Sequence, residues 1–145
     1  MKTYADTSLL FSLYSTDSNS TKADSWRSIN PDPLPFTAFH RLELRNALNL
    51  AVFQKRLTPA EVQYAWEEVE NDIAAGLLVA RGGLWHRVLG EAEAISRDHT
   101  STIGCRTLDV LHVAAAKLVG VTGFCTFDTR QADLARKVGM TPVTP

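Results

Sequence analysis

The chain contains, from Cys105 to Lys117, the stretch Cys-Arg-Thr-Leu-Asp-Val-Leu-His-Val-Ala-Ala-Ala-Lys. Its apolar residues cover every side of a helical wheel, and a helix that is apolar all round is usually buried. Asp109 stands inside this stretch. An isolated carboxylate is costly to remove from water, so Asp109 must be protonated, capped, paired or bound to a cation. The predicted buried helix therefore carries a charge that needs a partner.

The composition is that of one ordinary globular domain. The chain has 145 residues, of which 45% are hydrophobic and 21% are charged, so we expect a single domain over residues 1–145 with a substantial core. No apolar run has the length of a signal peptide or a membrane span, so we expect a cytoplasmic protein without membrane contact. Cys105 and Cys125 match neither a disulfide framework nor a zinc pattern, and we expect reduced core thiols.

A formal net charge of −1 argues against a protein that coats nucleic acid nonspecifically, because such binding depends on excess Lys and Arg. It leaves room for a local site. Acidic residues gathered in a cleft could be surrounded by a phosphate-binding rim of basic residues. The candidates for this rim are Arg41, Arg45, Arg106 and Arg130.

The first segment predicts a strand followed by a helix. Residues 2–5 are partly β-prone, and Asp6-Thr7-Ser8 precedes an apolar series from Leu9 to Tyr14. Asp6 would then end the first strand, where open α/β sheets commonly place ligand groups. Taken alone, however, Asp6 is more simply interpreted as a helix N-cap.

The next segment, residues 15–35, is rich in Ser, Thr, Asp, Asn and Pro. This composition predicts a loop with one short helix around residues 22–28, with Trp26 and Ile29 as apolar anchors. A short strand is expected at residues 34–37, and a helix begins at Ala38. Its predicted apolar positions are Phe39, Leu42, Ala47, Leu50 and Ala51.

Glu43 lies four residues from both Phe39 and Ala47, so a helix would point its carboxylate along the apolar stripe rather than to water. A buried or half-buried carboxylate at this position would be a candidate for chemistry. The alternative is an ordinary ion pair with Arg41, Arg45 or another basic group at the edge of the stripe.

A clear helix start follows at Thr58-Pro59-Ala60-Glu61, with a capping box and Pro at the first helical position. Gly76 is a plausible stop. We expect the acidic residues of this helix to form a solvated face; they are Glu67, Glu68, Glu70 and Asp72. A strand at residues 77–80 and a helix at residues 85–95 are predicted next.

The C-terminal part predicts the buried helix after Thr107, then a strand from Gly123 to Phe127 that ends at Asp128. Thr107 could be the N-cap, which places Asp109 in the first turn, where the helix dipole favours negative charge by about 0.3–1 kcal/mol. A helix at residues 129–138 and an edge strand at residues 140–143 complete the chain. Strands and helices alternate, which predicts a mainly parallel sheet with helices on both faces.

Four carboxylates, those of Asp6, Glu43, Asp109 and Asp128, occupy positions that could meet at one edge of this sheet. Four separate caps or surface pairs are the alternative. Like charges close together in a low dielectric repel strongly, so a cluster requires protons or a cation. An all-oxygen site of this kind suits Mg²⁺ or Mn²⁺.

The order and flanks of these acids resemble those of PIN-domain ribonucleases, and within that group the VapC-like toxins of type II toxin–antitoxin pairs. The resemblance spans almost the whole chain. The matching pieces are Ala5-Asp6-Thr7-Ser8-Leu9-Leu10, Arg41-Leu42-Glu43-Leu44, Arg106-Thr107-Leu108-Asp109-Val110-Leu111-His112-Val113-Ala114-Ala115-Ala116 and Thr126-Phe127-Asp128-Thr129-Arg130-Gln131.

The resemblance implies a Rossmann-like PIN fold and an endoribonuclease that uses Mg²⁺ or Mn²⁺ to activate water. It implies that Asp6 and Asp109 are the most direct metal ligands. Glu43 and Asp128 would complete the acidic pocket, partly through bound waters, and the hydroxyl of Thr126 would support it. A homodimer and a cognate antitoxin that blocks the cleft are implied as well, with residues 15–35 and the helix from Thr58 as candidate contacts.

Three basic residues near the acids have two interpretations each. Arg106 and Arg130 could contact phosphate or form structural salt bridges with the neighbouring acids. His112 could be a general base, but a packed, hydrogen-bonded core histidine is the more ordinary interpretation.

Two other functions compete with the nuclease. The first is a catalytically silent PIN domain that binds RNA or a protein; four retained acids argue against it. The second is a different Mg²⁺-dependent phosphate enzyme, which is disfavoured because the chain lacks a Gly-rich phosphate loop and an Asp-x-Asp nucleophile motif.

Overall fold

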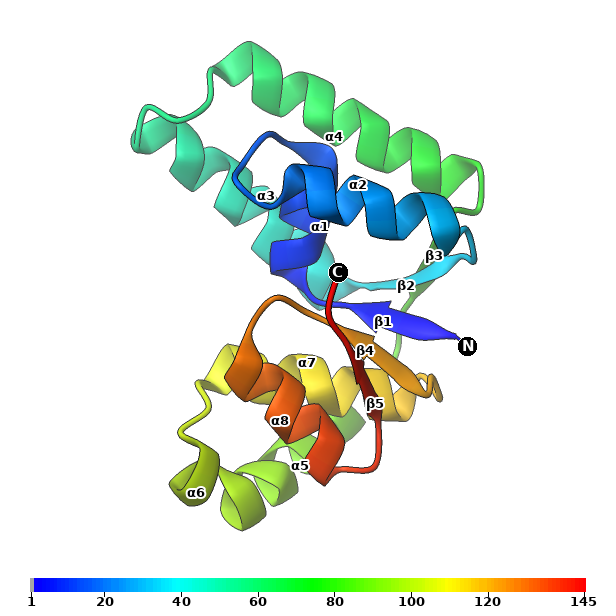
Figure 1. The fold of residues 1–145 in the computed structure, drawn as a ribbon, viewed down its shortest axis with the longest axis vertical. Coiled ribbons are helices and arrows are strands. Elements are labelled where there is room, and N and C mark those ends of the chain that lie inside the picture. The colour runs from blue at the N-terminus through cyan, green and yellow to red at the C-terminus, as the bar shows by residue number, and fades with distance from the viewer. Residues whose placement is uncertain (1) are drawn as a thin grey trace. The chain divides into compact units, whose positions relative to one another are not determined.

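The computed structural model describes residues 2–145 as an alternation of short strands and helices (Figure 1). In chain order the elements are β1 (Thr3–Ala5), α1 (Thr7–Tyr14), α2 (Ser20–Ile29), β2 (Leu34–Thr37), α3 (Ala38–Phe53), α4 (Pro59–Ala74), β3 (Leu78–Arg81), α5 (Trp85–Ile95), the π-helical turn η1 (Ser96–Thr100), α6 (Ser101–Ile103), α7 (Thr107–Leu118), β4 (Gly123–Cys125), α8 (Thr129–Lys137) and β5 (Thr141–Val143). Among the described residues, no helix combines the length and apolar character needed to cross a membrane.

The chain forms two compact units. One contains β1 with Asp6 and the part of the chain from residue 81 to residue 144. The other contains residues 7–80. The boundary between Asp6 and Thr7 therefore falls one residue after the end of β1.

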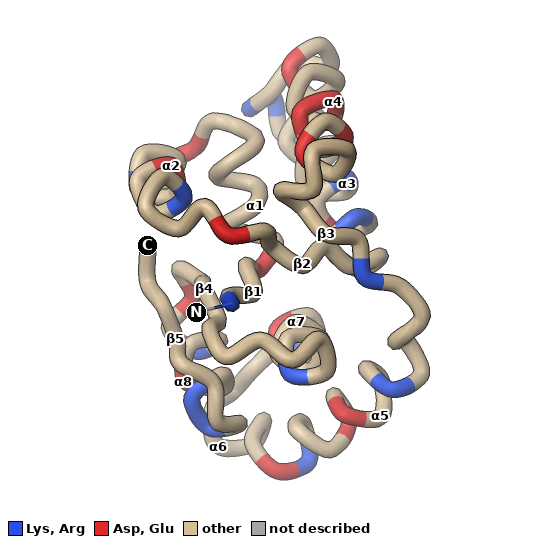
Figure 2. The backbone as a smooth tube through the Cα atoms, turned by 90° about the vertical axis from the view of Figure 1, so that its right-hand side faces the viewer, with Lys and Arg blue, Asp and Glu red and all other residues tan. Residues whose placement is uncertain are grey.

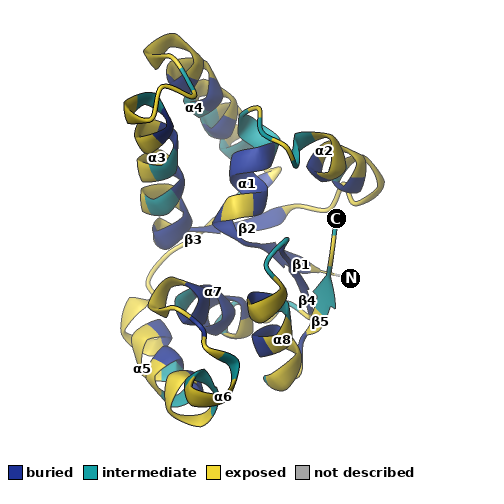
Figure 3. Ribbon diagram, turned by 60° about the vertical axis from the view of Figure 1, so that its left-hand side comes forward, coloured by how far each residue is buried: buried dark blue, intermediate teal, exposed yellow. Residues whose placement is uncertain are grey.

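The first unit is built on a three-stranded parallel sheet with the order β1-β4-β5. Ala5 pairs with Cys125, and Cys125 pairs with Val143, so the three strands end at the same edge. β1 and β4 are buried throughout (Figure 3). The expected α/β class, with a parallel sheet flanked by helices, is confirmed, and β5 is the edge strand that the sequence predicts.

The buried helix predicted after Thr107 is α7, and its agreement with the prediction is close. Val113, Ala114 and Ala116 have no exposed area, and α5 packs against α7. Leu108 differs, because 47% of its area is exposed. Thr107 is also the first helical residue rather than the N-cap, which is Arg106. The helix is therefore core on most sides but not on all.

The second unit has β2 and β3 as a separate two-stranded sheet, which corrects the expectation of one sheet for all strands. Leu44, Leu48 and Val69, from α3 and α4, have no exposed area and form its core. Leu42 and Leu50 were expected in the apolar stripe of α3, but 70% and 45% of their areas are exposed.

Two local predictions in this unit have opposite outcomes. The capping box at Thr58 is confirmed: its hydroxyl accepts from the N–H of Glu61, and the Glu61 carboxylate accepts from the N–H of Thr58. The segment after Tyr14 is more helical than expected, because α2 covers Ser20–Ile29. Within α2, Trp26 is buried as predicted, but Ile29 is 78% exposed, so the prediction that Ile29 packs into the core is wrong.

The acidic residues of α4 gather along this helix (Figure 2) but are not simply solvated. Glu70 forms an ion pair with Arg41. Asp72 accepts a hydrogen bond of 2.5 Å from the hydroxyl of Tyr14. Burial, and then this carboxylate, raise the pKa of Tyr14 above its usual value. Part of the predicted solvated face therefore joins α1, α3 and α4.

Candidate active site

Asp6 directly follows β1, and Thr126 directly follows β4, its neighbour in the sheet. The N–H of Asp6 donates to the carbonyl of Cys125 at 3.2 Å, which extends the strand pairing by one residue. Oγ1 of Thr126 lies 2.8 Å from Oδ2 of Asp6. Both side chains are buried, with 4% and 1% of their areas exposed. A direct hydrogen bond therefore joins Thr126 to Asp6, and the supporting role of Thr126 in a metal site stays a prediction.

Asp128 begins α8 as its N-cap. Its Oδ1 accepts from the backbone N–H groups of Arg130 and Gln131, at 2.8 and 3.1 Å. Its own N–H donates to Oγ1 of Thr126 at 3.0 Å. The capping interpretation is thus correct for Asp128, and the same geometry links it through Thr126 to Asp6.

Asp109 lies in the first turn of α7 and is 8% exposed. The backbone N–H and the Nε of Arg106 both donate to its Oδ2 at 3.2 Å. Nη2 of Arg106 is 3.9 Å from Oδ2 of Asp128. Both hydrogen bonds from Arg106 reach the same oxygen of Asp109, so the other carboxylate oxygen can face a cation. Arg106 therefore connects the second and third acids of this unit.

Three of the four predicted acids belong to one hydrogen-bonded and ionic network. Thr126 ties Asp6 to Asp128, and Arg106 ties Asp128 to Asp109. These groups come from the ends of two adjacent parallel strands and from the starts of two helices, α7 and α8, where backbone N–H groups also favour negative charge.

Glu43, the fourth predicted acid, belongs to the other unit. It lies in α3 and is half-buried, and its Oε2 accepts from the hydroxyl of Thr7 at 2.5 Å. Thr7 is the residue after Asp6 in the chain. Of the basic residues that the sequence offers as ion-pair partners for Glu43, Arg41 pairs with Glu70 and Arg45 stacks over the ring of Trp66 at 4.3 Å.

Both cysteines are free and buried, as predicted. Burial, and then the charge of Asp6, raise the pKa of the Cys125 thiol to about 12. Burial, and then the charges of Asp109 and Asp128, raise the pKa of Cys105. A thiol with a raised pKa is a poor nucleophile at neutral pH. Neither thiol is therefore a candidate nucleophile of this site.

His112 is a packed core residue, which confirms the more ordinary of its two interpretations. It is 2% exposed, its Nδ1 lies 2.9 Å from the hydroxyl of Tyr4, and the two rings meet edge to face with centroids 5.7 Å apart. Tyr4 in turn stacks on Phe124 of β4.

Gln131 is a residue of this site to which sequence reasoning gave no role. It lies in α8 with 2% of its area exposed, and its amide oxygen Oε1 is 2.9 Å from Oγ1 of Thr126. A signal was available: Gln131 is a polar residue three positions after an N-cap, on the face of a helix that also carries the buried Leu134 and Ala135.

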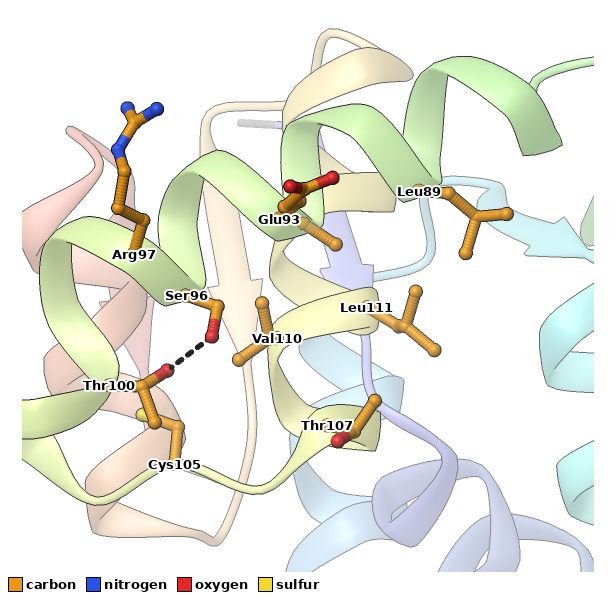
Figure 4. Close-up of a pocket in the computed structure, with 10 residues that line it drawn as sticks. Leu89, Glu93, Ser96, Arg97, Thr100, Cys105, Thr107, Val110 and Leu111 are labelled. Atoms are coloured by element: carbon orange, nitrogen blue, oxygen red, sulfur yellow. Dashed lines mark hydrogen bonds between the residues drawn. The ribbon is translucent and has the colours of Figure 1, made fainter.

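A separate cavity of about 510 Å³ lies beside α7 (Figure 4). Leu89, Val110 and Leu111 supply apolar walls, and Ser96 accepts a hydrogen bond of 3.2 Å from Thr100 at its rim. None of the four predicted acids lines this cavity. The cavity is therefore large enough for a ligand but lacks the carboxylates of the candidate active site.

The donor set at the sheet edge fits Mg²⁺ or Mn²⁺ in type, because carboxylate and hydroxyl oxygens are the ligands these ions prefer. Within residues 2–145, no three His, Cys, Asp or Glu side chains already stand close enough to form a complete ligand group. Mg²⁺ does not require one, since it usually keeps several waters and binds through one or two carboxylates. Asp6 and Asp109 satisfy that smaller requirement in residue type.

Together these features define an α/β protein with a carboxylate site where parallel strands end. A family model described as PIN domain matches residues 3–137. The chain therefore belongs to the PIN domain family. PIN domains are generally nucleases and typically use a divalent metal, so membership supports a hydrolase.

The solved structures include one with the same fold, the crystal structure of FitAcB from Neisseria gonorrhoeae. It is similar to this chain with a TM-score of 0.63 and 20% sequence identity, over 97% of this chain and 95% of that chain. At this identity the likeness shows the fold alone. A search of curated proteins gives no significant match.

Proposed function

We propose that this chain is an endoribonuclease that depends on Mg²⁺ or Mn²⁺ and cleaves RNA phosphodiester bonds with an activated water. The observation that carries the proposal is the network joining Asp6, Asp109 and Asp128 at the edge where β1 and β4 end. Two of these carboxylates are nearly buried, which is costly for negative charges unless a cation compensates them.

Asp6 and Asp109 would hold the metal directly, and Asp128 would contribute through bound water. We include Glu43 as the fourth acid on the basis of the sequence resemblance. A divalent cation at these residues would lower the pKa of a water molecule and offset negative charge on the phosphate. In the hydrolysis, the water gives up a proton to solvent and its oxygen forms a bond to phosphorus, while the bond from phosphorus to the leaving ribose oxygen breaks. The leaving oxygen takes up a proton from solvent, so the numbers of protons balance.

The protein groups position and balance charge in this proposal. Thr126 fixes the Asp6 carboxylate, and the helix cap fixes Asp128. Arg106 is 72% exposed while it bridges two of the acids, so its guanidinium can also meet an incoming phosphate. The ion pair of Arg106 with Asp109 supports a structural role, and that role is compatible with contact to phosphate.

We further propose that the nuclease is a VapC-like toxin of a type II toxin–antitoxin pair, acting in the cytoplasm as a single domain and a homodimer. The support is the set of sequence motifs together with PIN family membership. A cognate antitoxin would occupy the acidic site and block RNA. Co-purification of the chain with the product of a neighbouring small gene for a DNA-binding protein would test this partner.

The nuclease proposal is tested by RNA cleavage with purified protein in Mg²⁺, in Mn²⁺ and in EDTA. The wild type should cleave only with metal, and Asp6→Asn and Asp109→Asn should each lose at least about a hundredfold in rate, because each removes a charged metal ligand. Asp133→Asn is the matched control, since Asp133 is an exposed acid of α8 paired with Arg136.

The control should retain the wild-type rate. Equal cleavage by wild type, Asp6→Asn and Asp109→Asn would remove the proposed mechanism. RNA binding by the wild type without cleavage under any metal condition would instead identify a silent PIN domain that acts as a binding module.

A further inference from the structure

The hydroxyl of Thr126 is the centre of the buried part of the site. Its Oγ1 lies 2.8 Å from Oδ2 of Asp6, 2.9 Å from the side-chain amide of Gln131 and 3.0 Å from the backbone N of Asp128. Three polar groups therefore surround one oxygen atom that carries one proton and two lone pairs.

The Thr126 hydroxyl has a single proton to donate, and this limits which of the three contacts can be hydrogen bonds at the same time. The N–H of Asp128 uses one lone pair of the hydroxyl. With the amide oxygen Oε1 of Gln131 facing Thr126, as it does in the structure, the single hydroxyl proton has two acceptors, Asp6 and Gln131. One of the two contacts then brings two oxygen lone pairs together. An ionised carboxylate is the stronger acceptor, so the conflict would fall on Gln131.

A half-turn of the Gln131 amide removes the conflict, because it places Nε2 where the structure has Oε1; the two orientations of an amide have the same shape and are distinguished by their hydrogen bonds. Nε2 then donates to Oγ1 of Thr126, the Asp128 N–H donates to the same oxygen, and the hydroxyl proton is directed to Asp6. Each of the three short contacts becomes a hydrogen bond with one donor and one acceptor.

We propose that Gln131 is a positioning residue of the metal site, which donates through Nε2 to Thr126 and thereby directs the Thr126 hydroxyl proton onto Asp6. The consequence of this arrangement is that Asp6 is held in a fixed rotamer for the cation, and this part rests on the proposed metal-dependent function. The hydrogen-bond direction itself does not depend on metal or activity.

The position of Gln131 makes it suitable for this role. Its backbone N–H donates to Oδ1 of Asp128 at 3.1 Å, while its side chain contacts Thr126. The same residue therefore supports Asp128 with its backbone and Asp6 through Thr126. With 2% of its area exposed, the side chain has little freedom to exchange this contact for water.

The direction of the bond is tested by NMR on the metal-free wild type. The two Gln131 side-chain amide protons should show nuclear Overhauser contacts to the Thr126 side chain and should exchange with D₂O much more slowly than those of the exposed Gln63. A Gln131 amide that exchanges as fast as that of Gln63, or that lacks contacts to Thr126, would overturn the proposal.

The consequence is tested by Mn²⁺ binding, measured by calorimetry. Gln131→Met keeps the side-chain length but removes the donor, and we expect about fivefold weaker Mn²⁺ binding, the effect of losing one buried hydrogen bond. Thr126→Val should weaken binding by at least as much. In the Thr126→Val background, Gln131→Met should have no further effect, because Gln131 acts through that hydroxyl.

Two controls separate this role from a general loss of structure. Thr126→Ser retains the hydroxyl and should retain Mn²⁺ affinity, and Gln63→Met should bind as the wild type does. Additive effects of Thr126→Val and Gln131→Met, or unchanged affinity in Gln131→Met, would contradict the positioning role.

The outcomes also distinguish this inference from the proposed function. If the wild type binds Mn²⁺ and cleaves RNA while Gln131→Met is unchanged, the inference alone fails. If the NMR contacts are present but the wild type binds no Mn²⁺, the metal-dependent function fails and the hydrogen-bond direction stands.

Discussion

Replacing Asp109 by Asn should separate the stability of the fold from the function of the site. Asn keeps the size of the side chain, and its amide oxygen can still accept the N–H of Arg106 that Asp109 accepts at 3.2 Å. The substitution removes the ion pair with Arg106, which is 72% exposed, so the loss is about 0.2–1 kcal/mol. It also removes the charge repulsion between Asp109 and Asp128, which lie on the same Arg106 guanidinium. These effects oppose each other, and the free energy of unfolding without metal should change by less than about 1 kcal/mol.

With metal the outcome should differ. A ligand that binds only the folded state stabilises it by RT ln(1 + [L]/Kd), which is about 1.4 kcal/mol when Mg²⁺ or Mn²⁺ is present at ten times its Kd. For a chain of this length that corresponds to an increase of about 3–6 °C in Tm. The wild type should show this increase, and Asp109→Asn should lose most of it because a charged ligand is gone.

The assay is thermal unfolding followed by circular dichroism, in EDTA and over a series of metal concentrations. Asp133→Asn is the control, because it removes an i,i+3 ion pair with Arg136 at an exposed position and should keep the metal-dependent increase in Tm. A loss of several kcal/mol for Asp109→Asn in EDTA would show that Asp109 is primarily structural. An undiminished metal response in that variant would refute its role as a ligand.

Three further predictions concern the core, pH and a cap. Tyr4→Phe should lower the free energy of unfolding in urea by about 1–3 kcal/mol, because it leaves Nδ1 of the buried His112 without this partner; an unchanged urea midpoint would contradict it. The pKa of Tyr14 is raised by burial and then by Asp72, so the folded protein keeps this proton to higher pH than the unfolded chain, which releases it near pH 10. The contribution of Tyr14 to the free energy of unfolding should therefore be fully present below about pH 10 and be lost above it. In urea unfolding between about pH 9 and 11, the free energy of unfolding should fall less steeply with pH in Tyr14→Phe than in the wild type. Thr58→Ala should lower the free energy of unfolding by about 1 kcal/mol by removing the helix cap, whereas equal thermal stability would show that the capping box is dispensable.

Local chemistry made much of the fold predictable. The strand at Leu34–Thr37 and the helix start at Thr58 lie where the sequence predicts them, because turn and capping signals act over a few residues. The buried helix after Arg106 was predictable from its continuous apolar surface. The sequence signals for α2 were weaker, because few apolar residues mark its buried face, and the sequence did not show whether Ile29 lies on the buried or the exposed face.

The apolar stripe of α3 shows where periodicity was insufficient. Leu42 and Leu50 lie at plausible helical spacing, yet the packed face of α3 uses Leu44 and Leu48 instead. Two apolar stripes were compatible with the same sequence, and the choice depends on which neighbouring elements pack against the helix.

The sequence by itself determined the α/β class, the PIN resemblance and the identity of the acids, because these depend on residue type and order. Only the tertiary structure decided the state of each acid in the sheet-edge network. It joined Asp6 to Thr126, made Asp128 both a cap and a neighbour of Arg106, and brought Gln131 to the same hydroxyl. Asp6 and Thr126 are 120 positions apart in the chain, and only the pairing of β1 with β4 places them at hydrogen-bond distance. Asp109 is therefore held by both its helix terminus and Arg106, in the position where we propose that a cation completes its neutralisation.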